Sequence, residues 1–483
     1  MEEVKTRLKK TQPYLSNEEW SVQSHNIRTL HSLCWAGLRS DYKIITKDQI
    51  QEFSKLYSWK LSAKFARVSE EDWLLGVGAI TDDDDLWMKV QRARLTMTDP
   101  ADDALDPGEA QLLKKLDRDY RAYKAERDLI DFTGMVEEAI KRRIVPEDIS
   151  EIHVDEAQDM CALFYTYHLM LYKALEVPVT WYGDEDQSIY AFMGSDHTLF
   201  VNHPAEETVY GELSRRMTKT LAREANDYIS NNKQRFPKKI VALKEGIKSA
   251  HYTNLDAALD ELWEVGTGTV LWLAATNAQI QTIRDELIRR EEPVMTSEGE
   301  DAARKLIELI KTKPRKLKAE DLKNLVAATV AGKKLIPYQR KFFDKPYDMA
   351  TKIKQYIEGT ESLPFGGLSV TDGGFSPWLA GVLLTGEWER LLDEDQLAIA
   401  RSLERGATKR YRIELSTFHK SKGREADTVV ICKDVRGKAL AGVIKDEEMG
   451  RRLGFVAMTR ALRGNIYYRE DGRGTQDYWR VTT

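Results

Sequence analysis

Acidic side chains follow short apolar runs at two neighbouring places in this chain, and this pattern constrains the fold most strongly. In "EIHVDEAQD", Asp155 and Glu156 come directly after Ile152 and Val154. In "VPVTWYGDEDQ", an apolar run is again followed by acids and then by Gln187. The stretch between them, "MCALFYTYHLMLYKALE", is long and apolar enough for a helix. A strand, a helix and a strand in this order predict a parallel sheet with its polar residues at the carboxyl ends of the strands.

The same alternation returns in the second half of the chain. "GTVLWLAATNAQIQTIRDELIRR" predicts a buried strand and an amphipathic helix, and "YRIELSTFHKSKGREADTVVICKD" predicts two strands around a polar loop. "GRRLGFVAMTRALRGNIYYRED" predicts a helix and then a strand. We therefore expect an α/β protein with two parallel-sheet lobes, each interrupted by a mainly helical insertion. The expected boundaries are 1–40 with 130–205 for the first lobe, 41–129 for its insertion, 206–296 with 406–483 for the second lobe, and 297–405 for a basic helical insertion.

Composition limits the class of protein and its partners. A chain of 483 residues predicts about three domains. No apolar run reaches the ~18 residues of a membrane span, and the three scattered cysteines favour a reduced, cytoplasmic protein with buried thiols. The net charge is −5, but residues 301–354 hold fifteen Lys or Arg against six Asp or Glu. This local excess indicates a polyanion partner or, about equally, a set of solvated helix faces.

The acids after the first strand suit nucleotide chemistry. Asp155 could hold Mg²⁺, directly or through water, and Glu156 could polarise a water that attacks a phosphate. For an isolated pair of acids, a solvated helix start is the commoner explanation. The amide of Gln187 could contact a phosphate or its attacking water, while Tyr190 and Phe192 could stack on bases. Aromatic side chains at such positions are otherwise core residues.

The polar loop "STFHKSKGREAD" carries donors around a turn that glycine permits. Thr417, His419 and Lys422, with Gly423, suit contacts to a phosphate backbone, although such side chains in a loop are usually just solvated.

Two arginines complete the candidate residues. Arg460 falls on the apolar stripe of "MGRRLGFVAMTRA", and a guanidinium on an inward face needs an anionic partner. That partner is either a carboxylate in a salt bridge or a γ-phosphate. Arg216 in "LSRRMTKTLAREAND" is predicted at the start of a helix and is a second arginine of this kind, unless it is simply exposed.

In this order, the segments resemble the motifs of the UvrD/Rep-type superfamily 1 DNA helicases. "VDEAQD" resembles the Walker B motif, "GDEDQSIYAFMGS" the third motif, and "LSRRMTKTLAREAN" the segment that reads "NYRS…AN" in the family. "STFHKSKGREAD" resembles motif V and "RRLGFVAMTRA" motif VI. "NIRTLHSLC" is similar to the "GTFHSF" motif, and "LIDFTGMV" matches the segment before Walker B. The resemblance covers nearly the whole chain.

The resemblance implies two RecA-like lobes that use ATP and Mg²⁺ and move 3′ to 5′ on single-stranded DNA, with single-strand to double-strand junctions as substrates. The catalytic residues would be Glu156, Gln187, Arg216 and Arg460. Asp155, Glu425 and Gly423 would contact the nucleotide, with Asp155 as the metal ligand. The DNA-binding residues would be Thr29, His31, Tyr190, Phe192, Thr417, His419 and Lys422.

The chain also departs from the family pattern. Met193 stands where the family has arginine, and Arg215 stands at the tyrosine of "NYRS", which removes a stacking contact with the base. No G-x-x-x-x-G-K-[ST] phosphate loop occurs in the 483 residues. "MEEVKTRLKK" resembles the end of the helix after motif Ia, so the first lobe is expected to be incomplete at its N-terminus. A separate polypeptide could carry the Walker A segment. The alternative function is that of a non-catalytic single-stranded-DNA-binding helicase paralogue or scaffold subunit.

Overall fold

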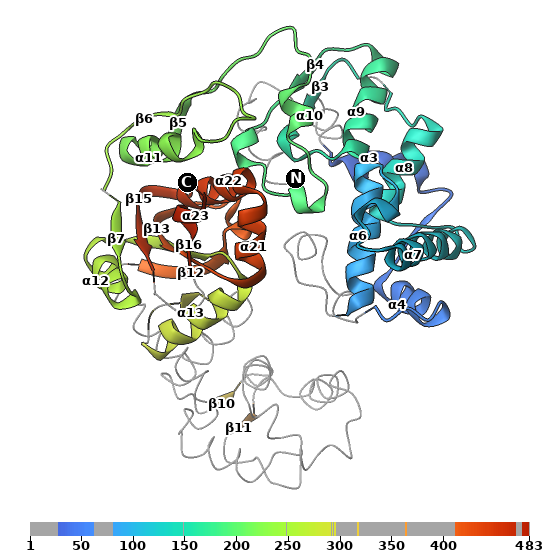
Figure 1. Cartoon of the computed structure of the whole chain (residues 1–483). Helices are drawn as coiled ribbons and strands as arrows, with labels where there is room; N and C mark the ends of the chain where they lie inside the picture. Colours follow the sequence, from blue (N-terminus) through green and yellow to red (C-terminus); the bar gives the residue numbers. More distant parts are fainter. Residues whose placement is uncertain are drawn as a thin grey trace. The chain divides into compact units, whose positions relative to one another are not determined.

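The structure is a computed structural model that describes residues 28–61, 81–147, 149–247, 249–290, 292, 294–295, 411–469 and 476–482, together with two short strands at 316–317 and 363–364. It divides into two compact units (Figure 1). Unit 1 comprises residues 1–210 and 229–238, and unit 2 comprises residues 211–228 and 239–483. The chain therefore passes from one unit to the other three times.

Unit 1 contains two short parallel strand pairs. β1 (Lys43–Ile44) pairs with β2 (Leu129–Ile130), and β3 (Ile152–Val154) pairs with β4 (Val179–Trp181). Ile152 lies opposite Val179 and Val154 opposite Trp181. Helix α9 (Ala162–Leu175) joins β3 to β4, so the predicted strand, helix and strand are confirmed.

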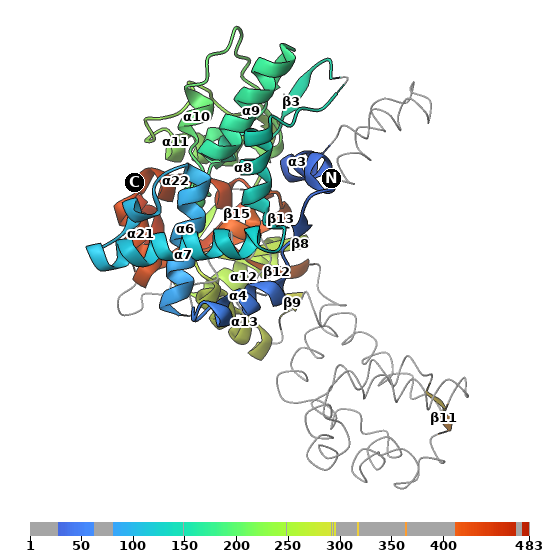
Figure 2. The ribbon, with the colours of Figure 1, turned by 90° about the vertical axis from the view of Figure 1, so that its right-hand side faces the viewer.

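Besides α9, the described part of unit 1 contains the helices α3 (Leu30–Leu38), α4 (Lys47–Leu56), α6 (Asp82–Thr96), α7 (Pro107–Ala125), α8 (Phe132–Arg142) and the short α10 (Thr198–Val201). The acidic run after Thr81 begins α6, because the Thr81 hydroxyl accepts from the Asp84 amide while the Asp84 carboxylate accepts from the Thr81 amide. Helices α6 and α7 cross and pack on each other (Figure 2). Their contact buries aromatic side chains, among them Trp87 and Tyr120, whose ring centroids are 4.5 Å apart.

Unit 2 is built on a parallel sheet of six strands in the order β7, β15, β13, β8, β12, β9. The bounds are β7 (Ala250–Tyr252), β8 (Gly268–Ala274), β9 (Val294–Met295), β12 (Tyr411–Thr417), β13 (Ala426–Cys432) and β15 (Ala461–Tyr468). The central strand β8 is buried on both faces from Val270 to Ala274, which explains its continuous apolar sequence "VLWLA". The strands predicted in the second half of the sequence are thereby confirmed.

Helices cover this sheet. The apolar sides of α12 (Leu255–Val265) and α13 (Asn277–Arg289) form one core cluster with Val270, Trp272 and Ala274 of β8. Helix α22 (Glu447–Met458) contacts β13, α21 (Gly437–Lys445) and the C-terminal α23 (Tyr478–Thr482).

Shorter elements complete unit 2. β5 (Leu213–Thr218) pairs in parallel with β6 (Val241–Lys244), and α11 (Lys219–Ile229) joins them (Figure 1). β14 (Asp434–Val435) pairs with β16 (Gln476–Asp477), and β10 (Lys316–Leu317) pairs with β11 (Leu363–Pro364).

The parallel sheets agree with the predicted α/β class. The two RecA-like lobes and the bounds of the four domains remain predictions, and nearly all of the basic insertion expected at 297–405 lies outside the described residues. All three cysteines are buried thiols, as predicted. Within the described part of the chain, none of the helices combines the length and the apolar character that crossing a membrane requires.

Candidate functional site

The two strand ends of unit 1 present the predicted acids and amide. Asp155 and Glu156 follow β3 and are exposed, while Gln187 ends the 3₁₀ turn η4 (Glu185–Gln187) that follows β4. Because β3 and β4 are parallel neighbours, their carboxyl ends lie at one edge of the sheet. The structure therefore brings the Walker B-like and third-motif-like segments together, as the sequence predicted.

Glu156 adopts an unusual backbone conformation. Its φ of 53° and ψ of 39° lie in the left-handed region, which costs an L-residue other than glycine about 1 kcal/mol. The Asp155 carboxylate accepts a hydrogen bond from the Glu156 amide at 3.0 Å. Five other described residues besides the glycines also have a positive φ, three of them at helix ends, so this conformation by itself does not assign a function to Glu156.

Gln158 joins the two strand ends. Its Nε2 donates to the Glu156 carboxylate at 2.5 Å, and its Oε1 accepts from the Asp184 amide at 3.0 Å. The Asp184 carboxylate in turn accepts from Gln187 Nε2 at 2.6 Å. A side chain at Gly183 would place its Cβ only 2.6 Å from Gln158 Oε1. Glu156 and Gln187 are thus linked through two side chains, and Gly183 leaves room for the link.

Asp155 meets the simplest requirement of a Mg²⁺ ligand, since it is an exposed carboxylate at a strand end. Among the described residues, no group of three or more His, Cys, Asp or Glu could hold a metal ion by itself. Mg²⁺ beside a nucleotide commonly takes only one or two carboxylates, with phosphates and water as its other ligands. The site fits Mg²⁺ brought with a nucleotide better than a resident metal.

Thr29 and His31 lie at the start of α3. The Thr29 hydroxyl accepts from the Ser32 amide at 3.2 Å and so caps this helix. The half-buried His31 ring packs edge-on against Phe132 and Phe164, with centroids 5.3 and 5.5 Å away. Burial lowers the pKa of His31, against the opposing effect of the Asp131 carboxylate, so the imidazole is mainly neutral at pH 7.

The aromatic pair after η4 is partly exposed. Phe192 exposes 44% of its surface, Tyr190 is half-buried, and their ring centroids are 6.4 Å apart in an edge-to-face arrangement. Phe192 is therefore accessible for stacking, whereas the neighbouring Met193 is buried.

Unit 2 brings together two residues that are far apart in the sequence. Arg216 Nε donates to the Glu425 carboxylate at 2.9 Å, and both side chains are exposed. Arg216 lies within strand β5, three residues before α11, and not at the start of the helix as expected.

Arg460 is buried, as its place on the apolar stripe predicted, with only 1% of its surface exposed. Its Nε donates to the Val456 carbonyl at 2.8 Å and its Nη2 to the Thr459 hydroxyl at 2.8 Å. The Ala426 amide donates to the Arg460 carbonyl at 3.1 Å. This backbone bond fixes Arg460 next to the segment that carries Glu425. Both residues directly precede paired parallel strands, so they lie at the amino ends and not at the carboxyl ends predicted for site residues.

The polar loop of unit 2 follows the carboxyl end of β12. Thr417 is buried and accepts from the Lys420 amide at 3.3 Å, and desolvation lowers the pKa of His419 to about 4. Lys422 is half-buried. Gly423 has a φ of +78°, and open space surrounds the position of a Cβ there. The turn thus needs glycine for its backbone conformation.

A buried ion network supports the helices of unit 1. Arg94 donates two hydrogen bonds to the Asp131 carboxylate, at 2.7 and 3.0 Å, and Lys124 Nζ lies 2.9 Å from it. Arg94 also pairs with Glu137 at 2.7 Å. Asp131 accepts from the Gly134 amide at 2.6 Å and so caps α8. The "LIDFTGMV" segment, noted in the sequence only as a family match, ties α6, α7 and α8 together.

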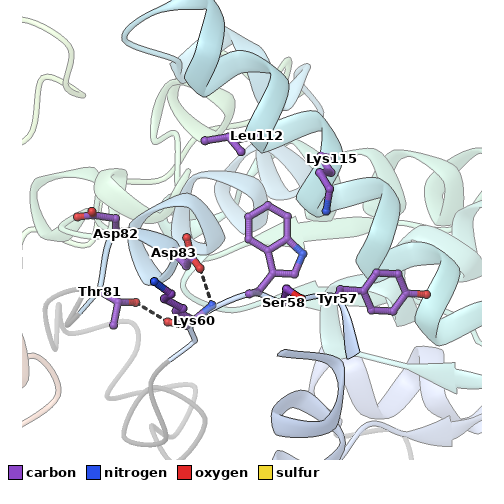
Figure 3. Close-up of a pocket in the computed structure, with 9 residues that line it drawn as sticks. Tyr57, Ser58, Lys60, Thr81, Asp82, Asp83, Leu112 and Lys115 are labelled. Atoms are coloured by element: carbon purple, nitrogen blue, oxygen red, sulfur yellow. Dashed lines mark hydrogen bonds between the residues drawn. The ribbon is translucent and has the colours of Figure 1, made fainter. Parts of the chain in front are cut away.

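A cavity of about 680 Å³ lies in the helical part of unit 1 (Figure 3). Trp59 and Lys115 line it, and the Lys115 ammonium lies 4.6 Å from the centroid of the Trp59 ring. None of the residues predicted for function lines this cavity, so we assign it no role.

Sequence reasoning missed four residues that organise the candidate site of unit 1. They are Gln158, Asp184, Arg235 and Lys238. Three consecutive acids shortly after an apolar strand could have indicated that cations must lie near them. Nothing in "NNKQRFPKKI" indicated that these cations come from residues 229–238.

Comparisons with known proteins agree with the resemblance. The model of the UvrD/REP helicase N-terminal domain matches residues 1–208. YjcD of Bacillus subtilis (strain 168) is 25% identical over 422 residues, which is 71% of this chain and 55% of YjcD. PcrA of the same organism is 28% identical over 204 residues, or 37% of this chain and 28% of PcrA.

PcrA of Staphylococcus aureus (strain Mu50 / ATCC 700699) is 29% identical over 165 residues, which is 32% of this chain and 22% of that protein. Both PcrA proteins are named ATP-dependent DNA helicases, and YjcD is named a putative ATP-dependent DNA helicase. The matched part of this chain spans about half the length of YjcD and less than a third of either PcrA.

Proposed function

We propose that the chain works as part of an ATP-dependent DNA helicase, because the UvrD/REP helicase N-terminal domain model matches residues 1–208 and the relatives resemble it in sequence. In this proposal, ATP hydrolysis drives movement 3′ to 5′ along single-stranded DNA. One observation carries the proposal furthest. The hydrogen bonds from Glu156 through Gln158 and Asp184 to Gln187 hold the groups that would act on a γ-phosphate in one connected arrangement.

Each group of unit 1 has a role that its chemistry allows. Asp155 would hold Mg²⁺ together with the nucleotide phosphates, and the metal would neutralise part of their charge. Glu156 would orient and deprotonate the attacking water, since its exposed carboxylate can reach solvent. Gln187 would orient the same water or contact the γ-phosphate with its amide.

Unit 2 would supply positive charge and DNA contacts. Arg216 and Arg460 would stabilise the charge that develops on the phosphate during transfer. Glu425, with Gly423 nearby in the chain, would approach the nucleotide sugar. Thr417, His419 and Lys422 would contact the DNA backbone, and in unit 1 Thr29, His31, Tyr190 and Phe192 would contact the DNA strand.

The proposal also requires a phosphate-binding loop, since the backbone amides and lysine of such a loop neutralise the β- and γ-phosphates. The pattern G-x-x-x-x-G-K-[ST] does not occur in the 483 residues. We propose that the loop comes from sequence outside these residues, either upstream in the same gene product or on a separate polypeptide.

The decisive experiment is the ATPase rate stimulated by single-stranded DNA, measured for the 483 residues alone and with a polypeptide that carries the phosphate loop. We expect turnover only with both, and a loss of at least about 10²-fold in Glu156→Gln. Glu151→Gln is the matched control, because the Glu151 carboxylate is 63% exposed and lies just before the same strand.

Two outcomes would overturn parts of the proposal. Robust turnover by the 483 residues alone, abolished by Glu156→Gln, would show that no further loop is needed. Tight binding of single-stranded DNA with no turnover under either condition would favour a non-catalytic DNA-binding protein.

A further inference from the structure

Three consecutive carboxylates follow β4, and two of them are fully buried. The side chains of Glu185 and Asp186 expose 0% of their surface, whereas Asp184 exposes 29%. A buried carboxylate is stable only with a partner that replaces its hydration. The position of η4 must therefore depend on the cations beside it.

Residues 229–238 provide these cations. Arg235 donates two hydrogen bonds to the Asp186 carboxylate, at 3.0 and 2.7 Å. The Lys238 ammonium lies 2.8 Å from Asp184 and 3.3 Å from Asp186, and it also pairs with Glu185. A bidentate guanidinium and an ammonium shared by three carboxylates fix both the charge and the geometry of this turn.

The backbone and an aromatic ring of the same segment add to this contact. The Phe236 amide donates to the Glu185 carboxylate at 2.8 Å. The Phe236 ring meets the Phe200 ring edge-on, with centroids 5.5 Å apart. The segment is thus docked by charge, by a backbone donor and by apolar packing at once.

The pKa shifts of Lys238 and Asp184 are consistent with a network that is charged at neutral pH. Burial by itself would lower the pKa of Lys238, but the three carboxylates raise it above its usual value. Burial by itself would raise the pKa of Asp184, but Lys238 and hydrogen bonds hold it below its usual value. Burial raises the pKa of Glu185, and Lys238 opposes this effect.

Asp184 connects this network to the residues proposed for hydrolysis. One of its carboxylate oxygens faces Lys238 and the other accepts from Gln187 Nε2 at 2.6 Å. Its amide donates to Gln158, which donates to Glu156. Displacing Lys238 would therefore release Asp184 and, with it, the two groups that Asp184 orients.

We propose that Arg235 and Lys238 are positioning residues for Gln187 and Glu156. The catalytic role in this inference rests on the proposed function, whereas the contacts of Arg235 and Lys238 are independent of it. The ten residues that carry both cations belong to unit 1, although the chain before and after them belongs to unit 2.

Hydrogen exchange tests the positioning without any need for ATPase activity. In Lys238→Met, we expect the amides of residues 184–188 and 156–159 to lose protection by about tenfold or more. Lys89→Met is the matched control in the same unit, because Lys89 pairs with Glu109 at 2.7 Å and is 21% exposed. This control should leave both segments within about twofold of the parent chain.

If Lys238→Met does not fold, Asp184→Ala provides the same test, since it removes the link and leaves both cations with Glu185 and Asp186. Unchanged protection of residues 184–188 in a folded Lys238→Met or Asp184→Ala variant would overturn the proposal.

Kinetics of the reconstituted ATPase separate positioning from a merely structural role. We expect Lys238→Met to lower kcat by about 10- to 100-fold with KM within about twofold, and Lys238→Arg to restore much of kcat. A rise in KM together with a fall in kcat, without rescue by arginine, would contradict the positioning role. If the parent chain has no ATPase under any condition, the proposed function fails, while hydrogen exchange still decides the contacts.

Discussion

The strands that carry candidate residues differ between the two units. In unit 1, β3 and β4 have three residues each, and Glu156 and Gln187 are oriented by side-chain hydrogen bonds and ion pairs. In unit 2, β12 and β13 have seven residues each and lie in a six-stranded sheet over a large apolar core. Unit 1 therefore holds Glu156 and Gln187 mainly by side-chain hydrogen bonds and ion pairs, whereas unit 2 holds Thr417 and Arg460 mainly by backbone pairing and packing.

The difference predicts what each unit tolerates. An ion pair between buried groups is sensitive to the loss of one partner, because the other is left buried without compensation. A packed sheet is sensitive to loss of volume, because the cavity does not close completely. The three predictions below test this contrast, from the largest expected effect to the smallest.

Trp272→Ala should have the largest effect. Trp272 is fully buried in the core of unit 2, and truncation of such a side chain typically costs about 4 kcal/mol of unfolding free energy. Urea denaturation followed by hydrogen exchange, which resolves the two units, measures the loss. Trp263→Ala is the matched control, because Trp263 is 61% exposed and should change stability by less than about 0.5 kcal/mol. Equal effects of the two variants would contradict a packed core as the main support of unit 2.

Asp131→Asn should destabilise unit 1 by about 3 kcal/mol, because Arg94 and Lys124 both depend on this carboxylate. Hydrogen exchange of α6, α7 and α8 reports the loss. Asp103→Asn removes an exposed pair with Arg92 at 2.8 Å, in which the side chains are 44% and 37% exposed, and should cost less than about 1 kcal/mol. If Asp131→Asn destabilised unit 1 no more than Asp103→Asn does, the stability of unit 1 would not depend on its buried charges.

Acid should weaken unit 1 through His168. Burial lowers the pKa of His168 to about 4, so the folded state keeps the imidazole neutral while the unfolded chain takes up a proton near pH 6.5. The stabilisation of the folded state that depends on a neutral His168 is fully present above pH 6.5 and is lost as the pH falls towards 4. Between pH 7 and pH 5 the expected loss is about 2 kcal/mol.

Comparing the pH dependence of unfolding in the parent chain and in His168→Leu isolates this effect. The control is His153→Leu, because the His153 side chain is 49% exposed. If the free energy of unfolding depended on pH in the same way in the parent chain and in His168→Leu, His168 would not contribute to the loss of stability in acid.

Much of the fold could be predicted from local patterns. The strands around Asp155 and Gln187, the helix between them, and the loop from Thr417 to Glu425 all lie where apolar runs and polar breaks placed them. The burial of Arg460 followed from the helical spacing of its apolar neighbours. These features depend on residues close together in the sequence, so periodicity reveals them.

The long-range partners could not be predicted. Lys238 contacts Asp184 across more than fifty residues, and Arg94 contacts Asp131 across thirty-seven. Charged residues in the polar stretch "NNKQRFPKKI" look like those of any exposed connection, because charge alone does not specify a partner. Arg216 was placed at a helix start because apolar spacing does not fix where a strand ends and a helix begins.

The docked segment also bears on how the protein can be divided. The family match ends at residue 208, yet the unit that contains this match includes residues 229–238. A fragment cut after residue 210 would keep Glu185 and Asp186 in its interior and lose both of the cations that neutralise them. Such a fragment should aggregate, whereas one that regains residues 229–238 through a short linker should fold. We therefore expect that a stable fragment of the first half needs two separate stretches of the sequence.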